Sequence, residues 1–304
     1  MIIGGYFGQN PWQRGTTFAA VANGDYTADR FVYNKVGTMV HTVQRSSDVP
    51  VLTFPFDSPI VVSTNSLLID CTTADAAIAA ADFTILTYKI EGYDYCYYAQ
   101  QPLVLTFNVK ATKIGTYCVA FRNSTPDRSY VVEYTITAAN TWEKKTITVT
   151  ASPIAGTWDY TNGIGLQISW VLAAGSNFQT TANIWQAGNF LVTSNQVNGC
   201  DNILNNFLIE GIKFSHWDGT HSYDAFNDLF TREENLRRCQ RYYQKSYDQE
   251  VAPGTAIGEG CITHVNALAN LIVGADRSFA VQMRVTPTMA WYSTTTGTVA
   301  NIRN

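Results

Sequence analysis

The sequence predicts an all-β protein whose antiparallel strands pack as a sandwich. The chain has 304 residues, of which 46% are apolar and only 14% are charged, so it can bury a large core. It carries 17 Tyr, 15 Phe and 7 Trp. Thr, Val and Ile recur in short runs bounded by Gly, Asn, Asp and Pro, which is the pattern of strands and turns.

The clearest strands lie in residues 103–150, where LVLTFNV, GTYCVAF, SYVVEYTI and KKTITVT follow one another. Four strands in so short a stretch have the spacing of a β-meander. Leu103, Leu105, Phe107 and Val109 alternate with other residues, which places one face of that strand against a core. Antiparallel sheets are therefore expected.

Weaker runs of the same kind extend the sandwich on both sides. FVYNKV, HTVQRS, PIVVSTNSLLIDC and TILTYKIEGYDYCYY come before, and GLQISWVLA, ANIWQAG, FLVTSN and NNFLIEGIKFSH come after. The alanine-rich stretch 73–82 has the composition of a short helix capped by Thr73. We predict a sandwich body over residues 31–229, preceded by an N-terminal arm and entry segment over residues 1–30.

One short α-helix is predicted near residues 231–245, within a connector that spans 230–251. Thr231 and Glu234 form a T-x-x-E capping box, and Leu236, Cys239 and Tyr243 share one helix face. A run of charges on a helix is usually a solvated face, although it could also bind a polyanion. The basic residues concerned are Arg232, Arg237, Arg238, Arg241 and Lys245.

A small C-terminal β region is expected over residues 252–304, either as a separate lobe or as a completion of the sandwich. It begins with the loop APGTAIGEG and continues with CITHVNALANLIV, SFAVQMRVTP and MAWYSTTTG. Pro287 follows one of these runs and favours an edge position, because proline cannot donate to a strand ladder.

Charge and cysteine usage narrow the classes of partner. With 20 Lys+Arg and 24 Asp+Glu the net charge is −4, which disfavours nucleic acid as a ligand. The opening MIIGGYFGQNPWQRG lacks the pattern of a signal peptide, and no apolar run is long enough to cross a membrane. We therefore expect synthesis in the cytoplasm and no membrane insertion.

The 6 widely spaced cysteines are expected to be reduced and buried, a disulfide framework being the alternative.

The sequence shows no signature of catalysis. It has no G-x-S-x-G, no H-E-x-x-H and no phosphate-binding G-K-[ST] motif, and the expectation is a non-enzymatic protein without a cofactor. His216, Asp218 and His221 in HWDGTH are a weak candidate for a divalent cation. A turn rich in Asp and Gly recruits the same residues for local hydrogen bonds, so no metal site is predicted.

Aromatic side chains are the candidates for ligand binding. The segment EGYDYCYYAQQ is predicted to continue a strand, with Tyr93, Tyr95 and Tyr97 on one face and Asp94, Cys96 and Tyr98 on the other. Rows of tyrosine can stack on sugar rings or can simply fill a sandwich core. Three further residues in or near Asn- and Gly-rich connections are candidates either to stack on sugars or to plug an end of the sandwich: Trp158, Tyr160 and Trp185.

An ordered set of motifs is more specific than any one of them. In chain order the motifs are NPWQRGTTF (10–18), GDYTADRF (24–31), YKIEGYD (88–94), LTFNVKATKIGTYCVAFRN (105–123), NTWEKKTITV (140–149), GLQISWVLAAGS (165–176), LRRCQRYYQKS (236–246) and MRVTPTMAWYSTTTG (283–297). From about residue 10 to the C-terminus this set resembles a family of bacteriophage and prophage virion proteins. They are tail-fibre or structural proteins whose body is similar to a carbohydrate-binding-module jelly roll.

The resemblance implies a jelly-roll β-sandwich located in the virion, with no catalysis and with adhesion to a host surface polysaccharide as its role. A capsid decoration or head-fibre protein without sugar affinity is the alternative, and a capsule-degrading enzyme is a third class. The expected partners are other phage virion proteins and further copies of the chain, with a homotrimer as the default assembly. Residues 209–226 depart from the V-Q-L-E-x-G and A-T-P-F-E pattern of the family, so no contact of that stretch is carried over.

Overall fold

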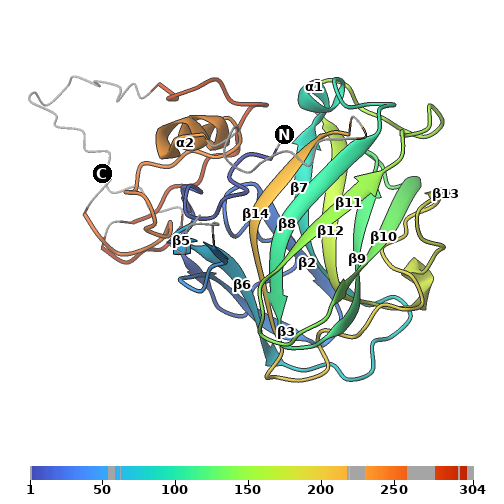
Figure 1. Cartoon of the computed structure of the whole chain (residues 1–304). Coiled ribbons are helices and arrows are strands. Elements are labelled where there is room, and N and C mark those ends of the chain that lie inside the picture. Colours follow the sequence, from blue (N-terminus) through green and yellow to red (C-terminus); the bar gives the residue numbers. More distant parts are fainter. Residues whose placement is uncertain are drawn as a thin grey trace, which may run out of the picture.

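Two six-stranded antiparallel sheets pack face to face in the computed structural model, which confirms the predicted fold class (Figure 1). The structure describes residues 2–53, 59–61, 63–217, 219, 230–258, 278–293 and 295–299. Sheet A has the strand order β1-β3-β6-β14-β8-β11, and sheet B has the order β13-β10-β9-β12-β7-β2. Strands β4 and β5 form a separate pair.

The bounds of the elements are as follows. Sheet A contains β1 (Thr17–Phe18), β3 (Val40–Ser46), β6 (Ser66–Thr73), β8 (Leu103–Ala111), β11 (Glu143–Val149) and β14 (Asn206–His216). Sheet B contains β2 (Phe31–Val36), β7 (Phe83–Glu91), β9 (Gly115–Arg122), β10 (Arg128–Ile136), β12 (Ile164–Ala174) and β13 (Trp185–Ala187). The remaining elements are β4 (Val51–Thr53), β5 (Pro59–Val61), α1 (Gly92–Tyr95), the 3₁₀ turn η1 (Ser176–Phe178) and α2 (Arg232–Gln240).

The chain crosses repeatedly from one sheet to the other, as in a jelly roll. It passes from β6 in sheet A to β7 in sheet B, returns to β8, and crosses again on its way to β9, β11, β12 and β14. The start of β8 lies beside the end of β11, because Leu103 pairs with Val149. The connections 92–102, 123–127 and 150–163 therefore meet at one end of the sandwich, the α1 end, which is at the top of Figure 1.

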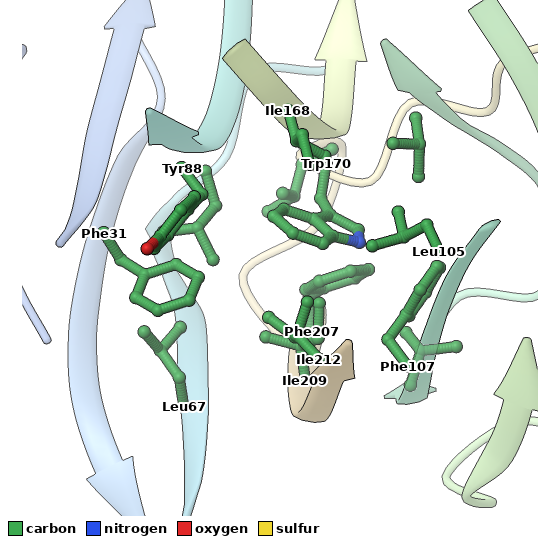
Figure 2. Close-up of a cluster of buried hydrophobic side chains, with 14 of the residues drawn as sticks. Phe31, Leu67, Tyr88, Leu105, Phe107, Ile168, Trp170, Phe207, Ile209 and Ile212 are labelled. Atoms are coloured by element: carbon green, nitrogen blue, oxygen red, sulfur yellow. The ribbon is translucent and has the colours of Figure 1, made fainter. Parts of the chain in front are cut away.

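Trp170 lies at the centre of the core between the sheets, as Figure 2 shows. It comes from β12, and Phe107 of β8 in the opposite sheet meets it edge to face at a centroid distance of 5.9 Å. Phe31 of β2 lies on another side of it at 6.5 Å. These contacts follow from the period-2 alternation of apolar residues in each strand, and each fully buried side chain of this size contributes about 2 kcal/mol.

The N-terminal segment is enclosed by the same core, although the sequence predicts an arm. Phe7 and Trp12 are fully buried, and Phe7 packs on Phe31 at a centroid distance of 5.0 Å. The Trp12 indole N–H donates to the carbonyl of Phe7 at 2.9 Å, and the Phe7 N–H donates to Glu210 of β14 at 2.9 Å. The predicted boundary at residue 30 thus divides two segments that share one core.

Helix α2 begins at the predicted capping box. The Glu234 N–H donates to Thr231 Oγ1 at 3.3 Å, and the Thr231 N–H donates to Glu234 Oε2 at 2.9 Å. The helix ends earlier than predicted, at Gln240, and the residues beyond it turn back onto the sandwich.

The prediction that the basic residues of this segment are solvated is wrong for Arg241, whose guanidinium binds both carboxylate oxygens of Glu91 at 3.0 and 2.6 Å. Nearby, the Arg30 guanidinium lies 3.4 Å from the ring centroid of Tyr242. The reason is tertiary docking: the end of β7 supplies a buried acid that the local sequence of the helix does not reveal.

Two further local predictions are wrong: the short helix over residues 73–82 and the strand over FLVTSN. Residues 74–82 form turns because Asp75 accepts the Ala77 N–H at 3.3 Å and thereby competes with helical bonds. FLVTSN packs on the outer face of sheet B, where Leu191 and Val192 are buried, without joining that sheet.

In the described residues of 278–299 the strand pairing is limited to an isolated bridge between Tyr292 and Val299. Residues 280–284 instead bind residues 241–244 through side chains and single backbone bonds. CITHVNALANLIV lies outside the described residues.

The five cysteines that the structure describes are free, and four of them are buried. The exception is Cys96, which is exposed in the turn after α1. In the described part of the chain no helix is long and apolar enough to cross a bilayer.

Candidate functional site

The α1 end of the sandwich brings together all the predicted sugar-stacking residues. Four of these residues are tyrosines in loop 92–102, and Trp158 and Tyr160 lie in loop 150–163. Strand β13 reaches the same end because its register pairs Trp185 with Tyr130, near the start of β10. The residues concerned are Tyr93, Tyr95, Tyr97, Tyr98, Trp158, Tyr160 and Trp185.

The prediction that residues 92–98 continue a strand is wrong. Strand β7 ends at Glu91, and the single helical turn α1 follows. The Gly92 N–H donates to the carbonyl of Gly163 at 2.9 Å, and a Cβ at Gly92 would lie 2.6 Å from the carbonyl oxygen of Asp159. Loop 150–163 therefore crosses the chain at a position that only glycine permits, and the two alternating faces of tyrosine do not form.

The helical turn separates the tyrosines by exposure. Tyr95 is buried, whereas Tyr93 and Tyr97 are 54% and 76% exposed. The latter two present their rings and hydroxyls to solvent and are available to a ligand.

Tyr95 is the centre of the cluster. Its ring stacks on Trp158 at a centroid distance of 5.5 Å and on Tyr160 at 6.2 Å, with interplanar angles of 19° and 6°. Its hydroxyl donates to Ser152 Oγ at 3.0 Å, and burial raises the pKa of that hydroxyl. Gly165 leaves room for the ring, because a Cβ there would lie 2.4 Å from the Cβ of Tyr95.

The stacking continues across the end of sheet B. Trp158 meets Trp185 edge to face at 5.7 Å, and Trp185 packs on Tyr130 at 5.4 Å. The five rings Tyr160, Tyr95, Trp158, Trp185 and Tyr130 are thus in continuous contact, and we call them the aromatic row.

The indole N–H groups of the aromatic row face the protein. Trp158 donates to the carbonyl of Ala155 at 3.2 Å and Trp185 to the carbonyl of Thr150 at 3.1 Å. Tyr160 is 39% exposed and both tryptophans are half-buried, so three members of the row offer ring surface to solvent.

Tyr98 belongs to a different contact at the same end. Its ring stacks on His216 at 4.8 Å and packs on Phe214 at 5.8 Å. Of the weak metal candidate, Asp218 and His221 lie outside the described residues. Among the residues that the structure does describe, no group of three or more His, Cys, Asp or Glu could hold a metal ion.

Two carboxylates of this end shape its loops. The Thr161 N–H and hydroxyl donate to Asp159 at 2.7 and 2.8 Å and lower the pKa of that carboxyl. The Asn123 amide, followed by Thr157, lowers the pKa of Asp127 in the same way. Both acids are ionised and hold the backbone that carries the aromatic row, so the arrangement is suited to stacking a ligand in a preorganised place.

Sequence reasoning missed the residues that support the aromatic row. Ser152, Tyr130 and Gly165 lie in three separate segments, and none has a local pattern that points to a ligand. The signal that was available is the glycine at the start of β12, a residue that often marks the close approach of another side chain.

Comparisons with known proteins yield only remote structural likeness. No protein-family model matches the sequence, and no curated protein matches it. A family 4 carbohydrate-binding module is 15% identical over 68% of this chain and 99% of its own, with a TM-score of 0.35. The family 11 module of a cellulosomal cellulase from Clostridium thermocellum is 11% identical over 67% and 98%, with a TM-score of 0.32. The N-terminal cellulose-binding domain of β-1,4-glucanase C from Cellulomonas fimi is 14% identical over 57% and 94%, with a TM-score of 0.29. No ligand or activity is transferred from these structures.

Proposed function

We propose that this chain is a non-enzymatic subunit of a phage virion, a tail-fibre or spike component that adheres to host surface glycans through its α1 end. The observation that carries the glycan-binding part is the aromatic row, whose half-exposed rings are fixed by hydrogen bonds and by Gly165. The phage assignment and the virion location rest on the resemblance of the ordered motifs.

The chemistry of the aromatic row suits a sugar. A pyranose presents an apolar C–H face that stacks on Tyr or Trp, while its hydroxyls bind polar groups at the rim. The rings of Trp158 and Tyr160 are held by the buried Tyr95, so little conformational entropy is lost on binding. Exposed Tyr93 and Tyr97 on the adjoining turn add hydroxyls.

Binding to a panel of bacterial surface polysaccharides tests this function. Tyr160→Ala and Trp158→Ala are expected to weaken binding by about tenfold or more, since one stacking contact is worth about 1.5 kcal/mol. Tyr26→Ala is the matched control, because Tyr26 is 38% exposed and lies outside the α1 end. Glycan binding that survives both ring deletions would refute the aromatic row as the adhesive site.

A purely structural virion role, as a capsid decoration or head-fibre protein, is the second candidate. The turns 112–114 and 201–205 lie at the opposite end of the sandwich, joined by an ion pair between Lys113 and Asp201. Ile114, Ile203 and Leu204 on these turns are exposed, which favours a contact with a neighbouring subunit.

The assembly state separates the two roles. We expect a homotrimer in light scattering, and Leu204→Ser should dissociate it if the turns at the opposite end form the contact. A trimer that persists in Leu204→Ser would place the contact elsewhere, and a reconstruction of the particle would show whether the chain sits on the head or on the tail.

A further inference from the structure

The outer face of sheet B, turned away from sheet A, carries a row of polar side chains that crosses five strands. Ser129 of β10 pairs with Arg122 of β9, which pairs with Gln167 of β12. The row continues to Gln186 of β13 on one side and to Lys89 of β7 on the other. The chain neighbours of these residues belong to the core between the sheets, so the row itself points outward.

Arg122 occupies the middle of this row and is only 7% exposed. Its Nη1 donates to Asn189 Oδ1 at 2.9 Å, and its Nη2 donates to Ser169 Oγ at 3.1 Å. Within the described residues its Nε has no hydrogen-bond partner. No carboxylate of those residues forms an ion pair with it, and burial lowers the pKa of the guanidinium to about 10.

A buried cation whose partners are all neutral is unfavourable for folding. The folded protein would be more stable with an acid beside Arg122 or with an apolar residue in its place. The same burial would strengthen the binding of an anion, because a charge-assisted hydrogen bond to a guanidinium is stronger in a desolvated place than in water.

The surroundings of Arg122 also suit an anion. Ser169 Oγ also lies 2.9 Å from Thr87 Oγ1, and both hydroxyls are buried, so these neighbours place no acid beside the guanidinium. Lys89 adds a second positive charge in the same row. The nearest acid along β7, Glu91, is already bound by Arg241.

We infer that the outer face of sheet B binds an acidic group, a carboxylate or a sulfate or phosphate, with Arg122 as its principal ligand and Lys89 as a second positive charge in the same row. The anion site stands independently of the aromatic row. Its extension, that the group belongs to an acidic sugar such as a uronate, rests on the proposed glycan-binding function.

Calorimetric titration at low ionic strength tests the inference with four probes: sodium sulfate, sodium glucuronate, polygalacturonate and neutral glucose. The comparison variants are Arg122→Gln and, as a matched control, Arg128→Gln, whose guanidinium donates to the carbonyl of Asp127 at 2.7 Å. We expect wild type and the Arg128 variant to bind at least one acidic probe and Arg122→Gln to bind it about tenfold or more weakly.

Thermal unfolding distinguishes loss of the anion site from loss of the folded structure in Arg122→Gln. Because Arg122→Gln removes an uncompensated buried charge, its melting temperature should equal or exceed that of wild type, while its response to the acidic probes disappears. If Arg122→Gln unfolds during purification, Arg122→Lys, which keeps the charge and loses the planar fork, should bind with intermediate affinity.

The outcomes are distinguishable. Binding of sulfate and glucuronate alike supports an anion site even if the glycan function fails, and binding of the acidic saccharides alone supports the extension to uronates. Absence of binding to every acidic probe, or equal binding by Arg122→Gln, overturns the inference.

Discussion

Glu210 shows how a single residue couples this fold to pH. Glu210 is 1% exposed, and its Oε2 accepts the N–H of Phe7 at 2.9 Å. Burial raises its pKa from 4.5 to about 8, so the group is neutral in the folded protein at neutral pH. The unfolded chain ionises this carboxyl at a much lower pH, and the stability contributed by the neutral form is therefore lost as the pH rises toward 8.

Glu210→Gln is expected to remove this dependence. In urea titrations the free energy of unfolding of wild type should fall between about pH 5 and about pH 8, by up to about 4 kcal/mol from this residue. The Gln variant should be less sensitive to pH and more stable than wild type near pH 8. Equal pH profiles for the two proteins would show that the carboxyl is solvated.

At the scale of elements, α2 is held to the sandwich by a side-chain clasp. Glu91 at the end of β7 binds Arg241 through two hydrogen bonds, and the Tyr242 hydroxyl donates to the same carboxylate. These hydrogen bonds, with Arg241 foremost, lower the pKa of Glu91 against the effect of its burial. The Gly4 N–H adds a bond to Asn235 on the helix at 3.2 Å.

Glu91→Gln should loosen α2 without unfolding the sheets. We expect hydrogen exchange to accelerate across residues 231–245 and global stability to fall by about 1–3 kcal/mol, a range that allows for the partial exposure of Arg241. Asp201→Asn is the control, since Asp201 pairs with Lys113 at the end of the sandwich opposite α1. Uniform acceleration over all strands would contradict a local clasp.

The elements also show what the sequence could and could not predict. Alternation in residues 103–150 predicted four strands correctly, and the T-x-x-E motif located the start of α2. The expected meander is wrong, because β8 pairs with β11 in sheet A while β9 and β10 pair with each other in sheet B. Residues 92–98 have the same alternating composition, yet they turn because loop 150–163 crosses at Gly92. The runs 278–287 and 289–297 have strand-like sequences, but their described residues form no ladder with either sheet. The alternation of apolar residues within a segment does not show whether the edge of another strand lies beside that segment in the fold.

At the scale of the whole molecule, the candidate site exists only when distant segments meet. Tyr95 lies in α1, Trp158 in loop 150–163 and Trp185 on β13, and their contacts depend on β7, β11 and β13 ending on the same side. Sequence analysis could select these residue types as candidates. It could not place them together, because a jelly roll joins strands that are far apart along the chain.

The enclosed N-terminal segment leads to a prediction about the complete fold. Deleting residues 2–13 removes the buried Phe7 and Trp12 and the N–H that bonds to Glu210. Since loss of one buried aromatic costs about 3–5 kcal/mol, the truncated chain should lose cooperative thermal unfolding. A calorimetric transition like that of wild type would show that the segment is a dispensable arm.

The position of β14 in sheet A has a consequence for biosynthesis. This strand, residues 206–216, is inserted between β6 and β8, which are made much earlier. Until the ribosome has delivered it, β6 and β8 each present an unpaired edge, open to pairing with another nascent chain. Sheet A therefore cannot close until residues 206–216 have been made, and aggregation during expression should respond to growth temperature and to chaperones that shield strand edges.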